Sequence, residues 1–439
     1  MAKAIILIFI SMLISASFVL KNKSEKSFIY IVLPSIFLFP NSFFFQLNSL
    51  PLMEITIPIA SLLVISAWYV FFKIYEAKFT YFDFLILLYI VAQFIIGIIK
   101  GEFGFSFRVF QSDLIQNYFL YFFARYYFRN SKLLKKSLKI IVIINILMLI
   151  FAPMEMFQGK YIIKYFWLSS YPFLQQAPRW GLNRIQLFFP HPIIAGICYS
   201  IFSIISVYFF VHTKIKKEKI FWGISVVLTF IGVVFSISRG TIAFLMIFYL
   251  VYFLERKKIN YKFLFIIGII FFIVFKQEFS SHEEVLDDSA NYRLNLIMNI
   301  DELIGQSMWI GYGGNIKYTG KVGYAWNNED TMTIDNFYLY RVFTGGIISL
   351  SLFMFLIFRA YYEYLKLKEI KECILEKDMK FVNLAIVVIF FIVINYFFVA
   401  NMYTTDLILY IMFGIISANY EKYILSTDNK VEYKFKRIL

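Results

Sequence analysis

The chain has 439 residues, of which 60% are hydrophobic and 21% aromatic, and its formal net charge is +15. A soluble globular domain contains roughly 45–50% apolar residues, so this composition excludes an ordinary soluble protein. The apolar runs are continuous rather than alternating, which excludes a membrane β-barrel. The basic residues lie between the apolar runs, which argues for membrane topology and against nucleic acid as a partner. We therefore expect an all-α polytopic membrane protein.

Apolar runs long enough to cross a bilayer recur along the whole chain and predict about 12–14 transmembrane helices. The two cysteines cannot form a disulfide framework or a metal site, and the acidic run EEVLDD has no ligand spacing for calcium. We expect no metal and no cofactor. In chain order, the thirteen predicted spans are 4–20, 27–44, 52–72, 82–99, 109–128, 139–154, 192–212, 219–236, 240–254, 262–275, 336–358, 381–399 and 403–419.

The basic clusters assign a side to each connection. With thirteen spans, the clusters in 21–26, 129–139, 214–219, 255–262, 359–380 and the C-terminal tail all fall on one face, which holds 30 of the 43 lysine and arginine residues. The positive-inside rule makes that face cytoplasmic. This register predicts that the N-terminus lies outside and the C-terminus inside.

Two outer loops are long, and long loops are usually functional or disordered. We expect a short helix over 289–304, where apolar residues recur at helical spacing. The predicted organisation is N-terminal spans over 1–154, a first outer loop over 155–191, spans over 192–275, a second outer loop over 276–335, and C-terminal spans with a cytoplasmic tail over 336–439.

The outer face is poor in basic residues but rich in arginine. Arginine offers a planar fork that matches phosphate oxygens two at a time, so this enrichment suggests an anionic ligand such as a lipid phosphate or pyrophosphate. The six outer arginines are Arg108, Arg179, Arg184, Arg239, Arg293 and Arg341.

Arg239 stands out because it interrupts the apolar stretch VVFSISRGTIAFL at a predicted helical hairpin. One interpretation is a turn residue whose side chain reaches the membrane interface. The other is an anion contact, assisted by Ser236 and Ser238, with Gly240 allowing a ligand or backbone to approach and the next helix presenting its N-terminal amides.

Four segments together resemble the O-antigen ligase and polymerase superfamily. SISRG at 236–240 resembles its Ser-Arg-Gly turn, and PRWGLNRIQLFFPHPIIAG at 178–196 its arginine-bearing outer loop. YRLNLIMNIDELIGQSMWIGYGG at 292–314 resembles its arginine helix and glycine-rich turn, and DNFYLYRVFTGGIISLSLF at 335–353 the asparagine-containing start of its next span. The resemblance covers about 178–358.

The resemblance implies an enzyme that transfers a glycan from polyprenyl pyrophosphate to another sugar at the outer leaflet, within a bundle similar to the GT-C glycosyltransferases. It implies a lipid-linked oligosaccharide and membrane lipid as partners, a chain-length regulator as a candidate partner, and no metal. Ligases of the superfamily usually carry histidine where this chain has Asp335, a departure that favours a polymerase of O-antigen or capsule repeat units over a ligase. A lipid-linked oligosaccharide flippase is the alternative from another class; a transporter usually shows repeat symmetry, and none is evident.

The predicted site residues fall in two groups, each with a structural alternative. Asp335 and Asn336 could act on the acceptor or simply cap a helix; His191 could be structural, and Arg341 could serve packing. The predicted catalytic residues are Arg239, Arg293, Asp335 and Asn336. The predicted pyrophosphate- and glycan-binding residues are Arg179, Arg184, His191, Ser238, Tyr338 and Arg341.

Overall fold

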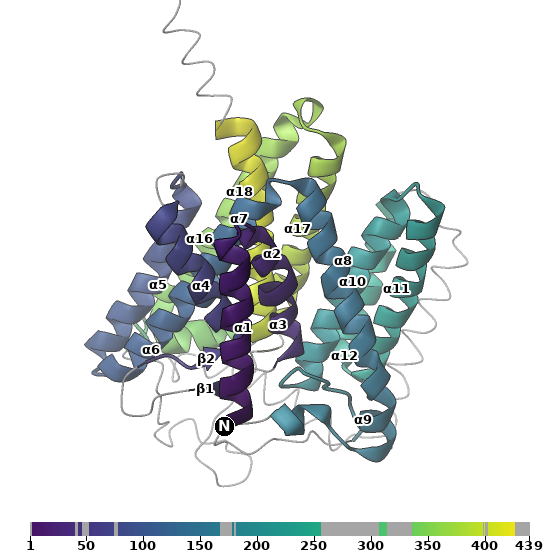
Figure 1. The fold of residues 1–439 in the computed structure, drawn as a ribbon, viewed down its shortest axis with the longest axis horizontal. Coiled ribbons are helices and arrows are strands. Elements are labelled where there is room, and N and C mark those ends of the chain that lie inside the picture. Colours follow the sequence, from purple (N-terminus) through teal and green to yellow (C-terminus); the bar gives the residue numbers. More distant parts are fainter. Residues whose placement is uncertain are drawn as a thin grey trace, which may run out of the picture.

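The computed structural model describes residues 2–39, 43–45, 52–73, 78–166, 178–179, 181–255, 307–313, 336–397, 399 and 403–425. The elements in these ranges are helices, apart from a two-stranded antiparallel ribbon and an isolated bridge. Most of the long helices run side by side along one direction, as a bundle (Figure 1).

The first quarter of the chain forms two long helices with a broken segment between them. Thr56 caps the second long helix, since its side chain accepts a hydrogen bond from the Ile59 N–H. The predicted span 27–44 is too long, because the helical residues end at Leu38. The elements are α1 (Ala2–Leu20), α2 (Ser24–Ser27), η1 (Phe28–Val32), α3 (Leu33–Leu38), β1 (Phe44–Phe45), β2 (Ile55–Thr56) and α4 (Ile57–Phe72).

The next hairpin has its turn at Gly101, whose φ of 76° favours glycine. Thr80 and Asp83 form a capping box at its first helix. The return helix begins at Phe103, six residues before the predicted 109, so Arg108 lies within a helix rather than in an outer loop. The elements are α5 (Tyr81–Ile99), α6 (Phe103–Asp113), η3 (Leu114–Phe119) and α7 (Leu120–Phe128).

The central helices surround α10, which is buried along nearly its whole length. Both α11 and α12 pack against it, and apolar side chains of α11 such as Ile220, Ile224 and Val227 remain exposed on the other side. The elements are α8 (Ser131–Met148), η4 (Leu149–Phe151), α9 (Ala152–Gln158), η5 (Ile162–Phe166), α10 (Pro192–His212), α11 (Lys216–Phe235) and α12 (Arg239–Glu255).

The C-terminal helices close the bundle. α18 packs closely on α7, where a Cβ on Gly414 would lie 2.7 Å from the Ala124 Cβ. The predicted span 336–358 is extended to Glu369. The elements are α16 (Phe337–Glu369), η8 (Lys371–Cys373), α17 (Glu376–Asn395), α18 (Tyr403–Tyr420) and η9 (Glu421–Leu425).

α16 is broken at Gly346, whose φ of 67° and ψ of −173° are not helical. A break frees backbone groups that a continuous helix would pair, and such groups need partners when they are buried. The carbonyls of Phe343 and Thr344 accept from the N–H groups of Tyr312 and Gly313, at 2.8 and 2.9 Å. Residues 312 and 313 of the second outer loop therefore donate hydrogen bonds to the interior of a helix.

The same loop also accepts hydrogen bonds from backbone N–H groups of the helix. The N–H groups of Ile347 and Ile348 donate to the carbonyls of Met308 and Trp309 at 2.9 and 3.3 Å. In an unbroken helix these two N–H groups would donate four residues back, to the carbonyls that the loop now occupies. Residues 307–313 thus replace two helical hydrogen bonds with four between loop and helix.

The bundle is a multi-pass membrane protein. Seven of the described helices are long and apolar enough to cross a membrane, and two shorter apolar helices cover Ile57–Phe72 and Arg239–Leu250. The predicted span 262–275 and the predicted helix 289–304 lie outside the described residues. In Figure 1 the N-terminus, α9 and the β1–β2 ribbon lie at the lower end, and the α10–α11 and α16–α17 turns at the upper end. The described basic turns therefore share the end opposite the first outer loop.

A buried ion pair stabilises the upper end. Arg125 of α7 donates to Asp83 of α5 at 2.6 Å, and their side chains are 2% and 0% exposed. Arg125 also donates to the Thr80 hydroxyl and to the Lys78 carbonyl. These contacts satisfy a charge that would otherwise be costly to bury, and they join the two helices far from the outer loops.

Candidate functional site

The first outer loop is organised by a buried glutamate. Glu155 of α9 is fully buried, and its carboxylate accepts from the backbone N–H groups of Ile162, Gln186 and Leu187 at 2.9, 2.8 and 2.9 Å. A buried carboxylate is stable only when such donors replace water. Glu155 therefore ties both ends of the first outer loop to α9.

The turn between α11 and α12 is compact and strained. Ile237 has a φ of 47° and is 2% exposed, an unusual backbone conformation for a β-branched residue. The turn lies against α10 at Gly196, where a Cβ would be 2.6 Å from the Ser236 Oγ and 2.7 Å from the Thr241 Oγ1. A Cβ on Gly240 would meet no described atom within 4 Å, so no described backbone approaches closely there, and the approach of a ligand to Gly240 stays a prediction.

The first outer loop delivers two arginines to this turn. The Arg184 Nε donates to the Ser236 carbonyl at 3.3 Å, and the Arg179 Nη1 donates to the Ile237 carbonyl at 3.2 Å. The next helix begins at Arg239. The structure thus brings together three of the predicted site residues, here named the arginine cluster: Arg179, Arg184 and Arg239.

The arginine cluster concentrates positive charge in a partly dry place. The Arg184 side chain is 3% exposed and forms no salt bridge with a described residue. Burial, together with repulsion from Arg179 and Arg239, lowers the pKa of Arg184 to about 9. The guanidinium is still charged at neutral pH. An anionic ligand would relieve the unfavourable electrostatic energy of this arrangement.

His191 and Ser238 lie beside the cluster. The His191 Nδ1 accepts from the Ile193 N–H at 3.2 Å and caps α10. Burial and the charges of Arg184 and Arg179 lower the pKa of His191 to about 4, so its imidazole is neutral near pH 7. With Nδ1 accepting, the ring proton is on Nε2, a donor available to a ligand. Ser238 is buried, and its carbonyl accepts from the Thr241 hydroxyl at 2.7 Å.

Arg341 belongs to a different group. It lies on the outer half of α16, with its guanidinium 4.7 Å from the Phe337 ring centre and 5.7 Å from that of Tyr89. Its charged neighbours are the carboxylates of Asp113 and Asp406. The predicted arginines therefore lie in two different sites. In the arginine cluster, Arg184 has no counter-ion among the described residues. At the other site, Arg341 has two carboxylates as neighbours.

Asn336 and Tyr338 make structural contacts at the start of α16. The Asn336 Oδ1 accepts from the Leu339 N–H at 3.1 Å as an N-cap, and its Nδ2 donates to the Phe397 carbonyl at 3.1 Å. The Tyr338 hydroxyl donates to the Val393 carbonyl at 2.7 Å. Their proposed roles in catalysis and glycan binding stay predictions. Arg293 and Asp335 lie outside the described residues.

Residues 224–354 match the family model described as O-antigen ligase. The matched stretch contains Ser238, Arg239 and Arg341. It covers α12 and parts of α11 and α16, while the described helices before α11 and after α16 lie outside it. The match confirms the resemblance to the O-antigen ligase and polymerase superfamily. A match to this family suggests a glycosyltransferase-like enzyme of polysaccharide assembly. No curated protein matches the chain.

Three polar residues of these sites were not predicted from the sequence. Glu155 and Asp113 are carboxylates within mainly apolar stretches, a signal that marks functional or structural sites in membrane proteins. The Gln186 side chain is fully buried, and neither its Oε1 nor its Nε2 has a hydrogen-bond partner. Buried amides rarely remain unsatisfied, so Gln186 is a further candidate ligand contact beside the cluster.

Proposed function

We propose that this protein is a polymerase of lipid-linked oligosaccharide repeat units of the O-antigen or capsule type. It transfers the growing glycan from polyprenyl pyrophosphate to an incoming repeat unit at the outer face of the bacterial cytoplasmic membrane. A membrane lipid carrier is thus both substrate anchor and leaving group. A chain-length regulator is a candidate partner.

The arginine cluster is the observation that carries the proposal. Each guanidinium can bind two oxygens of a diphosphate, and carbonyl anchors orient the guanidinium of Arg184 without neutralising it. Donors held in place before the reaction stabilise charge that develops in the transition state. A cluster of this kind suits a substrate whose leaving group is a diphosphate.

In the proposed reaction, an acceptor hydroxyl oxygen bonds to the anomeric carbon of the donor glycan. The bond between that carbon and the diphosphate oxygen breaks, and its electron pair stays on the departing lipid diphosphate. Arg239 and Arg184 stabilise the added negative charge, and the neutral His191 can donate a hydrogen bond from Nε2. The acceptor proton passes to a base, for which Asp335 is the predicted candidate.

Asp335 also favours a polymerase over a ligase, because ligases of this superfamily usually have histidine before the asparagine that corresponds to Asn336. A ligase that moves finished chains onto another acceptor is the alternative within the superfamily. A flippase is the alternative outside it. The basic turns lie at the end of the bundle opposite the arginine cluster, and by the positive-inside rule this supports a periplasmic position for the cluster.

A gene deletion separates these functions. Loss of a polymerase leaves the surface glycan capped with a single repeat, so the ladder of a polysaccharide gel collapses to one band. Loss of a ligase or a flippase removes every repeat. A bare core in the deletion strain would therefore overturn the polymerase proposal.

Substitution of Arg239 tests the site directly. Purified Arg239→Gln should extend a lipid-linked repeat about 100-fold more slowly than the wild type, the size of effect seen when one oriented donor is lost from a charge-stabilising site. Lys160→Gln is the matched control, because it removes one exposed positive charge from the first outer loop without touching the arginine cluster. Equal rates for Arg239→Gln and the wild type would remove Arg239 from the reaction.

A further inference from the structure

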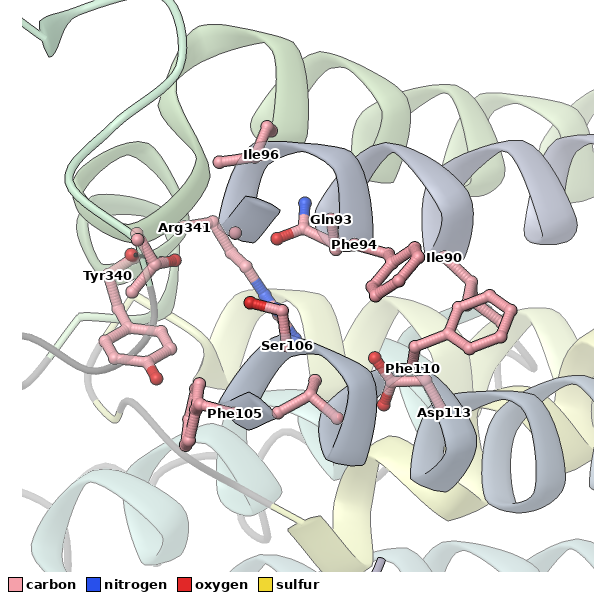
Figure 2. A pocket seen from close by; sticks show the side chains of 14 residues that line it. Ile90, Gln93, Phe94, Ile96, Phe105, Ser106, Phe110, Asp113, Tyr340 and Arg341 are labelled. Atoms are coloured by element: carbon pink, nitrogen blue, oxygen red, sulfur yellow. Dashed lines mark hydrogen bonds between the residues drawn. The ribbon is translucent and has the colours of Figure 1, made fainter. Parts of the chain in front are cut away.

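A second site lies between α5, α6 and the outer half of α16. It is a pocket of about 100 Å³, here named the α16 pocket, and its polar lining comes from Gln93, Ser106, Asp113, Arg341 and Thr344. Figure 2 shows the Arg341 side chain reaching from α16 into the space between the other two helices, with Asp113 farther along α6. Phenylalanine rings of α5 and α6 form part of the wall.

The α16 pocket differs in charge from the arginine cluster, because its lining holds a carboxylate as well as a guanidinium. Asp113 lines it with Arg341, and Asp406 is a second carboxylate that attracts the same guanidinium. A third carboxylate lies at the rim, because a Cβ on Gly313 would be 2.7 Å from an oxygen of Glu102. A guanidinium whose charged neighbours are the two carboxylates of Asp113 and Asp406 disfavours a diphosphate and favours a neutral ligand.

The polar groups of the pocket also suit a polyol. Arg341 forms no salt bridge with a described residue, and its buried Nε has no hydrogen-bond partner. Asp113 accepts one hydrogen bond, from the Asn117 Nδ2 at 2.9 Å, and a carboxylate has further acceptor positions. Adjacent donors and acceptors with aromatic walls match the hydroxyl groups and the apolar face of a sugar ring.

The broken helix keeps the α16 pocket in place. Gly313 lines the pocket and belongs to residues 307–313, which cross the break at Gly346. Its N–H donates to the Thr344 carbonyl at 2.9 Å. Irregular backbone at membrane depth is tolerated where it is buried in protein or lines a cavity. Strained backbone that is fixed by surrounding contacts is also frequent at ligand sites.

We infer that the α16 pocket binds a neutral sugar residue of the glycan through its hydroxyl groups, at a place separate from the arginine cluster that holds the diphosphate. This inference rests on the proposed function, since the glycan is the substrate named there. Asp113 accepts from sugar hydroxyls, Arg341 and Gln93 donate to them, and the rings pack on the apolar face. In Figure 1, α6 of the pocket and α9 and α12 beside the arginine cluster lie toward the lower end of the bundle. One lipid-linked glycan or its acceptor can then reach the pocket from the periplasmic side.

Two probes separate the sites. One is the repeat-unit oligosaccharide released from its lipid by mild acid, which carries no diphosphate, and the other is inorganic pyrophosphate. Each is titrated into the full-length protein in nanodiscs by calorimetry. Asp113→Asn and Val109→Phe, which fills the pocket without altering charge, should each weaken oligosaccharide binding about tenfold or more while leaving pyrophosphate binding unchanged. Glu376→Gln is the matched carboxylate control, on an 84% exposed side chain outside the pocket.

Three results would overturn the inference. The first is no binding of the oligosaccharide to the wild type at millimolar concentration. The second is unchanged oligosaccharide binding in both Asp113→Asn and Val109→Phe, with melting temperatures that show both variants to be folded. The third is an Arg341→Gln variant that loses pyrophosphate affinity as strongly as Arg184→Gln, because the pocket would then be an anion site. Pyrophosphate binding to the wild type and its loss in Arg239→Gln test the proposed function separately.

Discussion

Substitution of Gly346 by alanine should release the loop that crosses the break in α16. A Cβ at this position would lie 2.1 Å from the Trp309 carbonyl oxygen and 2.2 Å from its carbon, both backbone atoms that cannot rotate away. The φ of 67° adds left-handed strain for any L side chain, about 1–2 kcal/mol. Relief of the clash requires 307–313 to move.

The movement weakens or breaks the four hydrogen bonds between loop and helix, each of which contributes about 1 kcal/mol net to the free energy of unfolding. We therefore expect Gly346→Ala to lower the free energy of unfolding by about 2 kcal/mol if the loop shifts slightly, and by about 5 kcal/mol if it detaches. The measurement is thermal unfolding of the purified protein followed by intrinsic fluorescence. Extension of a lipid-linked repeat should fall as well, since Gly313 is part of the displaced segment and lines the same pocket as Arg341.

Gly104→Ala is the control, because a Cβ at Gly104 in α6 would meet no described atom within 4 Å. This change should leave stability equal or slightly higher, since alanine is the better helix former. A Gly346→Ala protein that unfolds at the wild-type temperature would refute the interlock of loop and helix. So would equal destabilisation by the two substitutions.

Three further predictions concern the buried polar groups. Glu155→Gln should weaken pyrophosphate binding about tenfold and lower stability by about 1–3 kcal/mol, because the amide is a poorer acceptor for the loop N–H groups; unchanged titrations in both assays would contradict the role of Glu155. The pKa of His191 is depressed to about 4, so its contribution to stability is present above its unfolded pKa of about 6.5 and is lost as the pH falls toward 4. Between pH 7 and pH 5 the stability lost through His191 is as much as about 2 kcal/mol. His191→Asn keeps a capping oxygen but does not titrate, so melting curves at the two pH values should show that this part of the pH dependence is absent. Asp83→Asn should cost about 3–5 kcal/mol by leaving Arg125 buried and unpaired, yet pyrophosphate affinity should stay at the wild-type value, since the pair lies at the other end of the bundle.

The arginines illustrate how far sequence reasoning reaches into the site. Arginine enrichment on the outer face predicts an anionic ligand, and the structure gathers Arg179, Arg184 and Arg239 around one turn. Nothing in the spacing along the chain separates Arg341 from them. The separation arises because α16 packs on α5 and α18. Asp406 of α18 and Asp113 of α6, which packs on α5, are then the charged neighbours of Arg341.

The glycines show the same limit. The pairs in WIGYGG and TGG are visible in the sequence as turn or close-packing signals, and both were noted for their resemblance to the superfamily. Their interlock was not predictable, because Gly311 and Gly346 are far apart along the chain and meet only after the second outer loop returns to α16. A Cβ on Gly311 would lie 2.6 Å from the Gly346 N.

The sequence by itself determined the membrane class, the helical architecture and the end of the bundle at which the basic turns lie. These properties depend on the transfer of each segment between water and lipid and on its own charge, which are local quantities. Only the tertiary structure decided which charges share a site, that Gly311 packs against the break in α16 at Gly346, and that Glu155 holds the first outer loop. Those outcomes depend on contacts between segments distant in the chain, and the burial of a polar group is tolerated only where such contacts supply its partners.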